Sequence, residues 1–188
     1  MVTKIAVFAS GSGSNFEAIA EAITRGELDA QIELVVTDKP GAFVVTRAQK
    51  FNIPVLEIAP KMFATKADYE AAVVEALREK DVKWVVLAGY MRLVSDTLLA
   101  AYHNRIVNIH PSLLPSFPGK DAIGQAMEHG VKVTGVTVHY VDAGMDTGKI
   151  IAQGAIGVVE GDRESTEQQI HELEHKLYTQ TLKQLFEV

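Results

Sequence analysis

The chain has 188 residues, of which 47% are hydrophobic and 22% are charged, a composition that is ordinary for a soluble globular protein with a sizeable core. Its 18 basic and 24 acidic residues give a net charge of −6, which argues against general nucleic-acid binding but leaves room for a local basic pocket that binds an anionic metabolite. Cysteine is absent, and no apolar run approaches the ~20 residues of a membrane helix, so disulfides, thiolate nucleophiles, cysteine zinc sites and a membrane span are excluded.

The first half of the chain alternates predicted strands with predicted helices. It begins with a strand over residues 4–9, rich in Ile, Val and Phe, and continues through a Gly-Ser turn into a helix from about Asn15, with Gly26 as its stop. The elements that follow, in order, are a strand at 32–37, a helix at 42–51, a strand at 54–58, a helix at 65–80 and a strand at 83–88. The last strand contains Trp-Val-Val-Leu and is too apolar to alternate, which predicts burial on both of its faces.

The second half continues the pattern and adds a loop stiffened by three prolines after residue 110. Its predicted elements, in order, are a helix at 96–102, a strand at 106–110, a helix at 121–129, an alternating strand at 133–141, a strand at 149–159 and a helix at 165–186. The whole pattern predicts a Rossmann-like α/β fold of three layers, with a mostly parallel twisted sheet of about seven strands and helices on both faces. Ligands of such sheets lie beyond the carboxyl ends of the strands, so the loops after Ala9, Ala88, His110 and Val141 are the candidate site.

The first of these loops contains Gly11-Ser12-Gly13-Ser14-Asn15. Free amide groups and the positive end of a helix attract phosphate there, and glycine lets the backbone approach the anion. The third glycine of a dinucleotide fingerprint would fall on Phe16, and no Gly-Lys-Ser/Thr follows, so a single phosphate fits better than a dinucleotide or a Walker loop. The alternative is a glycine turn that only links strand to helix.

Asn108 and His110 lie two residues apart at the end of a predicted strand and therefore point to the same face. An amide beside an imidazole is a plausible catalytic pair; the alternative is a turn cap beside an ordinary, partly buried histidine. Asp142 and Asp146 lie in a loop that follows the strand carrying His139. An acid near His110 would orient its ring or hold a water that carries protons, although aspartates in loops commonly serve turns.

Two further motifs have competing interpretations. Residues 171–175, His-Glu-Leu-Glu-His, match the H-E-x-x-H pattern of zinc peptidases, but little chain follows to supply a third ligand or a substrate cleft, and we predict no metal site. Met91-Arg92 follows a buried strand and offers one cation with a flexible apolar side chain. Arg92 would bind an acidic group of a ligand or merely pair with a surface carboxylate.

Four segments together resemble the phosphoribosylglycinamide formyltransferases, a family of folate-dependent enzymes of purine synthesis. They are Gly-Ser-Gly-Ser-Asn from residue 11, Val-Leu-Ala-Gly-Tyr-Met-Arg from residue 86, Asn-Ile-His-Pro-Ser-Leu-Leu-Pro from residue 108, and His-Tyr-Val-Asp to Met-Asp-Thr-Gly over 139–148. The resemblance covers essentially the whole chain. The third segment alone is shared by folate formyltransferases with other acceptors and does not define the acceptor.

The resemblance implies direct transfer of the formyl group of 10-formyltetrahydrofolate, as cosubstrate, to the amine of glycinamide ribonucleotide, without a metal. The implied catalytic residues are Asn108, His110 and Asp146. The residues implied to bind glycinamide ribonucleotide are Gly13, Ser14, Asn15 and Glu174. The residues implied to bind the folate are Lys66, Met91, Arg92, Leu93, Val94, Asn108, Asp142, Ala143, Gly144, Met145 and Asp146. The family can carry arginine where this chain has Lys66, and a lysine cannot make the forked pairing of a guanidinium.

We therefore expect one formyltransferase domain over residues 1–188, with a phosphate-binding half over about 1–105 and a catalytic and folate-binding half over about 106–188. The expected protein is a cytoplasmic monomer or homodimer that acts on small molecules, without nucleic-acid or membrane partners. Two alternatives stay open: a hydrolase that releases formate from 10-formyltetrahydrofolate, and a non-catalytic protein that binds a phosphorylated metabolite.

Overall fold

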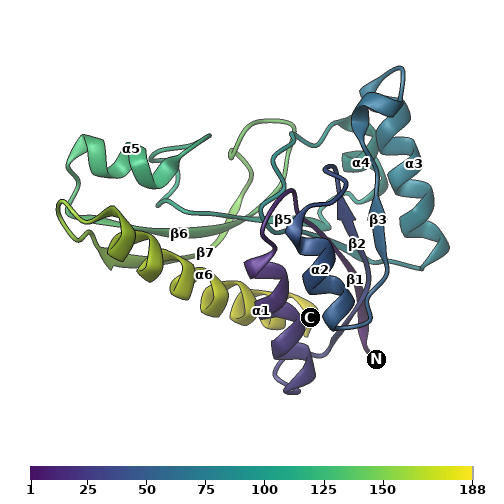
Figure 1. The fold of residues 1–188 in the computed structure, drawn as a ribbon, viewed down its shortest axis with the longest axis horizontal. Coiled ribbons are helices and arrows are strands. Elements are labelled where there is room, and N and C mark those ends of the chain that lie inside the picture. The colour runs from purple at the N-terminus through teal and green to yellow at the C-terminus, as the bar shows by residue number, and fades with distance from the viewer. Residues whose placement is uncertain (188) are drawn as a thin grey trace.

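Seven strands form one sheet in a computed structural model that describes residues 1–187 (Figure 1). The strands are β1 (Thr3–Phe8), β2 (Ala30–Thr37), β3 (Val55–Glu57), β4 (Trp84–Leu87), β5 (Ile106–His110), β6 (Val133–Tyr140) and β7 (Ile150–Gly157). The helices are α1 (Ser14–Thr24), α2 (Phe43–Lys50), the short 3-10 helix η1 (Pro60–Met62), α3 (Lys66–Glu79), α4 (Asp96–Ala101), α5 (Ala122–His129) and α6 (Arg163–Phe186).

The strand order is β3-β2-β1-β4-β5-β6-β7. The first five of these neighbours pair in parallel, whereas β6 runs antiparallel to both β5 and β7. This arrangement confirms the predicted α/β fold with a mostly parallel sheet. The carboxyl ends of β1, β4 and β5 therefore meet at one edge, where ligands of such folds bind.

Helices cover both faces of the sheet, as predicted. One apolar cluster joins the sheet to α1, α2, α5 and α6, and a second joins the opposite face to α3 and α4. In Figure 1, α3 and α4 lie together at one side, and α6 runs along β6 and β7. Strand β4 contributes Val86 to the first cluster and Val85 and Leu87 to the second, so this strand is buried on both faces as its sequence indicates.

The strand predicted at residues 133–141 is present as β6, but its alternating sequence does not correspond to alternating burial. Residues 134–139 are all buried. One face packs on α6, and the proline loop covers the other, where Thr137 donates a hydrogen bond to the Ser112 carbonyl (2.7 Å) and accepts one from the Leu114 amide (3.1 Å). Small and β-branched residues suit both a buried and an exposed strand face, so the sequence of β6 does not reveal that the proline loop covers its second face.

Helix α6 starts two residues before the predicted position because Asp162 caps it and accepts a hydrogen bond from the Ser165 amide (3.0 Å). Helix η1 was not predicted, and the Leu114-Pro115 peptide bond is cis. No helix within residues 1–187 combines the length and apolarity needed to cross a membrane.

Candidate active site

A cavity of about 570 Å³ opens at the carboxyl ends of β1, β4 and β5. It brings together all four loops that the topology singled out. The site residues predicted from the sequence that line it are Gly13, Ser14, Asn15, Met91, Arg92, Leu93, Val94, Asn108, His110, Asp142, Gly144, Met145, Asp146 and Glu174. Lys66, at the exposed first residue of α3, and Ala143 do not line it.

The glycine loop presents the start of α1 to this cavity. Gly13 caps α1 with a left-handed backbone (φ 78°) and contributes no side chain to the helix end, so the first amides of α1 face outward unpaired. A β-carbon at Gly13 would come within 2.6 Å of Val44 Cγ2, which explains why glycine is needed here. Arg47 holds the loop from α2 by donating to the Ser12 carbonyl (2.8 Å) and by pairing with Glu17.

Strand register places Asn108 directly opposite His139, on the cavity face of β5 and β6. His139 Nδ1 donates to the Tyr140 carbonyl (2.8 Å), which leaves Nε2 to accept a hydrogen bond from Asn108 Nδ2 (3.3 Å). Burial lowers the pKa of His139, and the nearby Tyr140 carbonyl and Asp146 carboxylate only partly offset this effect. A neutral His139 therefore fixes the orientation of the Asn108 amide and leaves its second N–H free.

His110 shares the face of Asn108, whereas Ile109 belongs to the apolar cluster that packs on α1 and α6, as the period of a strand predicts. The ring is only 6% exposed. Its Nε2 donates to the Phe117 carbonyl in the proline loop (2.9 Å), so Nδ1 is left facing Asp146, with 3.6 Å between Nδ1 and Oδ2. The His110 nitrogen that the proline loop leaves free, Nδ1, therefore lies beside the Asp146 carboxylate.

The two aspartates of the loop that follows β6 do different things. Asp142 accepts hydrogen bonds from the Gly144 amide (3.0 Å) and the Thr147 hydroxyl (2.6 Å), so its side chain shapes its own turn. Asp146 reaches out of the loop instead: its Oδ2 accepts from the Gly119 amide (2.8 Å), and its Oδ1 lies 3.8 Å from His139 Nε2. Asp146 is thus shared by three segments that are distant in the sequence.

Glu174 enters the cavity from α6 and is 5% exposed. It accepts a hydrogen bond from Asn15 Nδ2 (3.5 Å) and another from His171 Nδ1 (2.8 Å), and the latter raises the pKa of His171. Burial lowers the pKa of His175, the other histidine of the H-E-x-x-H match. Within residues 1–187, no group of three or more His, Asp or Glu side chains forms a plausible metal site.

Several lining residues were not among the predicted site residues. They include Ser10, Lys39, Lys120, Asp121, His139 and His171. Lys39 follows the carboxyl end of β2, so the same topological rule that selected the other loops applies to it as well. The strand pairing that brings His139 to the site is decided by register, which spacing along the chain does not reveal.

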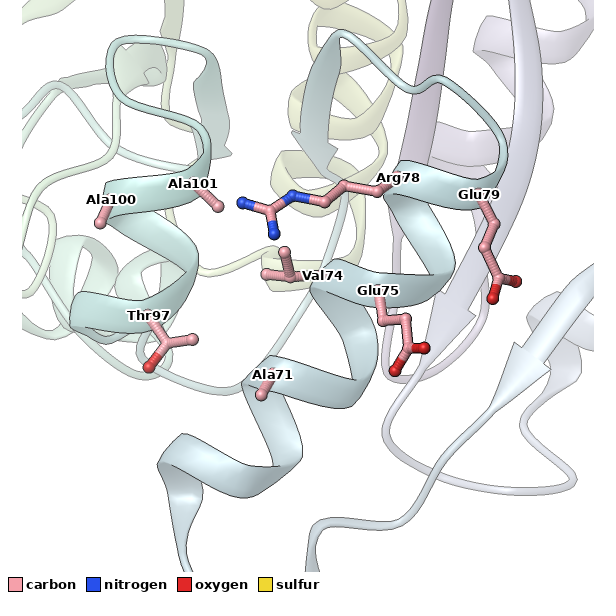
Figure 2. A pocket seen from close by; sticks show the side chains of 8 residues that line it. All are labelled: Ala71, Val74, Glu75, Arg78, Glu79, Thr97, Ala100 and Ala101. Carbon is pink, nitrogen blue, oxygen red and sulfur yellow. The ribbon is translucent and has the colours of Figure 1, made fainter.

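A second groove, of about 720 Å³, lies between α3 and α4 (Figure 2). Figure 2 shows Arg78 extending from α3 toward Ala101, with Ala71 and Val74 on the α3 wall. This groove contains none of the predicted site residues and has no histidine or amide side chain in its lining. The cavity at the strand ends, where an amide, an imidazole and a carboxylate converge, is therefore the better candidate for an active site.

Comparison with known proteins shows the family of this chain. The sequence model of the formyl transferase family matches residues 3–182. The chain belongs to the formyl transferase family. A relative in this family, phosphoribosylglycinamide formyltransferase of Bacillus subtilis (strain 168), is 57% identical over 183 residues, which is 97% of this chain and 94% of the relative.

Solved structures of other proteins show the same fold. The crystal structure of phosphoribosylglycinamide formyltransferase from Bacillus halodurans has a TM-score of 0.94 at 55% identity and covers 97% of this chain and 95% of its own. That of glycinamide ribonucleotide transformylase 1 from Geobacillus kaustophilus has a TM-score of 0.96 at 53% identity, with coverage of 98% and 99%. The formyl transferase fold thus spans nearly the whole chain.

Proposed function

We propose that this protein transfers the formyl group of 10-formyltetrahydrofolate to the amine of glycinamide ribonucleotide. The observation that carries the proposal is the convergence of Asn108, His110 and Asp146 between a glycine loop suited to phosphate and the irregular segment over residues 89–94. The high identity to phosphoribosylglycinamide formyltransferases over almost the full length supports the choice of acceptor.

Each residue of the proposed catalytic trio has one task. The neutral acceptor amine attacks the formyl carbon, and the carbonyl oxygen becomes an oxyanion that the free N–H of Asn108 stabilises. The attacking nitrogen must then lose a proton, and N10 of the folate must gain one as the bond from the formyl carbon to N10 breaks. His110 exchanges these protons through Nδ1, and Asp146 stabilises the ring while it is positive. Protons and bonds balance without a metal and without a covalent bond between substrate and enzyme.

The two substrates approach from opposite sides of this trio. We assign the ribose phosphate to the amides of Gly13, Ser14 and Asn15 at the start of α1, and the ribose and glycinamide end to Glu174. Among the remaining loops, those over residues 91–94 and 142–146 would hold the folate. Lys66 stays a predicted folate contact outside the cavity lining.

We further propose that residues 1–188 act as one formyltransferase domain. One apolar cluster connects Ile5 of β1 with Leu182 of α6, so the phosphate-binding half and the catalytic half share a core. The hydrogen bond between Asn15 and Glu174 also joins the two halves at the cavity.

The proposed function is tested by mixing the purified protein with 10-formyltetrahydrofolate, with and without glycinamide ribonucleotide, and following loss of the formyl folate and formation of the formylated product. We expect loss of the formyl group only when the acceptor is present, unaffected by a chelator. Formate release that ignores the acceptor would instead identify a hydrolase, and binding of the acceptor without turnover would identify a non-catalytic protein.

Substitution of Gly13 by alanine should raise the KM for glycinamide ribonucleotide roughly 10- to 100-fold, equivalent to about 1–3 kcal/mol of strain. The added β-carbon would collide with Val44 and occupy a left-handed backbone, so the loop must shift its amides away from the phosphate. Steady-state kinetics at saturating formyl donor measures the change.

The matched control is Gly26→Ala at the other end of α1. Gly26 has a similar backbone (φ 76°), but nothing lies within 4 Å of its added β-carbon, and the residue is outside the cavity lining. This variant should lose about 1 kcal/mol of stability from the same backbone strain and keep its KM. An unchanged KM in both variants would remove the glycine loop from the phosphate site.

A further inference from the structure

Ser10 joins three segments at the end of β1 and is 3% exposed. Its hydroxyl donates to Asp38 Oδ1 (2.6 Å), at the end of β2, and accepts a hydrogen bond from the Met91 amide (2.8 Å). Its own amide donates to the Gly89 carbonyl (2.9 Å). The residue immediately before the glycine loop is thus bonded to the segment over residues 89–94 on the other side of the cavity.

That segment has few other backbone restraints. Among the backbone amides of residues 90–94, that of Met91 alone has a hydrogen-bond partner within residues 1–187. The side chain of Tyr90 anchors one end of the segment: its ring packs edge-on against Phe8, and its hydroxyl shares a hydrogen bond with the Tyr69 hydroxyl (2.9 Å). The position of the backbone at Met91, however, depends on the Ser10 hydroxyl.

Asp38 determines which way this hydroxyl points. A serine hydroxyl has one proton and two lone pairs, and an ionised carboxylate only accepts hydrogen bonds. The short bond to Asp38 therefore uses the proton of Ser10 and leaves a lone pair for the Met91 amide. Asp38 is 7% exposed and does not line the cavity, and its hydrogen bond to Ser10 connects it to the Met91 amide.

We propose that Ser10, oriented by Asp38, is a positioning residue for the formyl donor: it holds the backbone of residues 91–94 at the distance from the glycine loop that lets both substrates meet at Asn108 and His110. The proposal rests on the proposed function for the identity of the donor. The structural part, a hydroxyl that holds the Met91 amide, is independent of it.

The test compares the unmodified chain with Ser10→Ala by two measurements. Hydrogen–deuterium exchange of the peptide that contains Met91 should speed up about tenfold in the variant, since one hydrogen bond is lost. Calorimetric titration should show tetrahydrofolate binding roughly tenfold more weakly, while ribose 5-phosphate binds within twofold of the unmodified chain. A purely structural loss would weaken both ligands alike.

Two further variants sharpen the test. In Asp38→Asn the side chain keeps an oxygen that can accept the proton of Ser10, although the amide can also turn its NH2 group toward Ser10. Ser10 then still holds the Met91 amide part of the time, so tetrahydrofolate affinity should fall less than in Ser10→Ala. Thr181→Val removes another buried hydroxyl, one that donates to the Leu177 carbonyl (2.7 Å) in α6 outside the cavity lining, and should change neither measurement.

The outcomes separate the inference from the function. If the unmodified chain does not bind tetrahydrofolate, the proposed function fails, and the donor role of Ser10 fails with it. If it binds tetrahydrofolate and Ser10→Ala binds equally well, the positioning role alone is overturned. A larger loss in Asp38→Asn than in Ser10→Ala would show that the carboxylate acts on the ligand directly and not by orienting Ser10.

Discussion

Replacement of His110 by alanine is expected to lower kcat about 100- to 10,000-fold, the usual contribution of a positioned acid–base group. His110 is the histidine whose free nitrogen faces both the cavity and a carboxylate, because the Phe117 carbonyl occupies its Nε2. Loss of the ring removes the group that we propose carries the proton from the attacking amine to N10. Single-turnover measurement of formyl transfer with both substrates saturating checks the chemical step directly.

His103→Ala is the matched control for this variant. His103 is exposed in the loop after α4 and does not line the cavity, so its removal should change kcat by less than twofold. Thermal unfolding of both variants shows how much of any loss comes from stability, since His110 is buried and its removal leaves a void. A folded His110→Ala variant with near-normal turnover would refute the assignment.

Replacement of Asp146 by asparagine is expected to lower kcat roughly 100- to 1,000-fold, a loss typical for removal of a preorganised electrostatic group. Asparagine is preferable to alanine as a probe because Asp146 has a left-handed backbone (φ 55°), which asparagine tolerates. The amide oxygen can still accept from the Gly119 amide. The fall in kcat therefore measures two effects: loss of the negative charge beside His110, and poorer ordering of the water that carries protons.

Asp81→Asn provides the control at the same backbone conformation. Asp81 also has a left-handed backbone (φ 54°), but it is exposed and pairs with Lys83 and Lys4 away from the cavity. This variant should keep its kcat. In the double variant of His110 and Asp146, the losses should not add, because the carboxylate acts through the ring. Additive losses would show that Asp146 works independently of His110.

The order of the elements was predictable because local physics dominates it. Apolar runs of strand length alternate with amphipathic helical segments, and this alternation leaves few topologies other than a parallel sheet covered on both faces. The prolines after His110 end β5, and Gly26 follows the last turn of α1, as their restricted or permissive backbones require. The rule on strand ends selected four loops, and these loops line one cavity in the folded chain.

The two loop aspartates show where such reasoning stops. Asp142 and Asp146 lie in one loop at similar distances from glycines, and nothing in their spacing distinguishes them. In the folded chain, Asp142 bonds within its own turn, whereas Asp146 reaches His110 and the Gly119 amide. The difference arises from the path of the loop across β5 and β6, which depends on strand register.

The sequence by itself determined the α/β architecture, the glycine loop before α1 and the pairing of Asn108 with His110 on one face, because each depends on residues that are close along the chain. Tertiary structure alone decided that β6 is buried on both faces, that His139 orients Asn108, and that Ser10 holds the Met91 segment. These features join residues from different strands, and their contacts form only when register and packing bring distant segments within hydrogen-bonding distance.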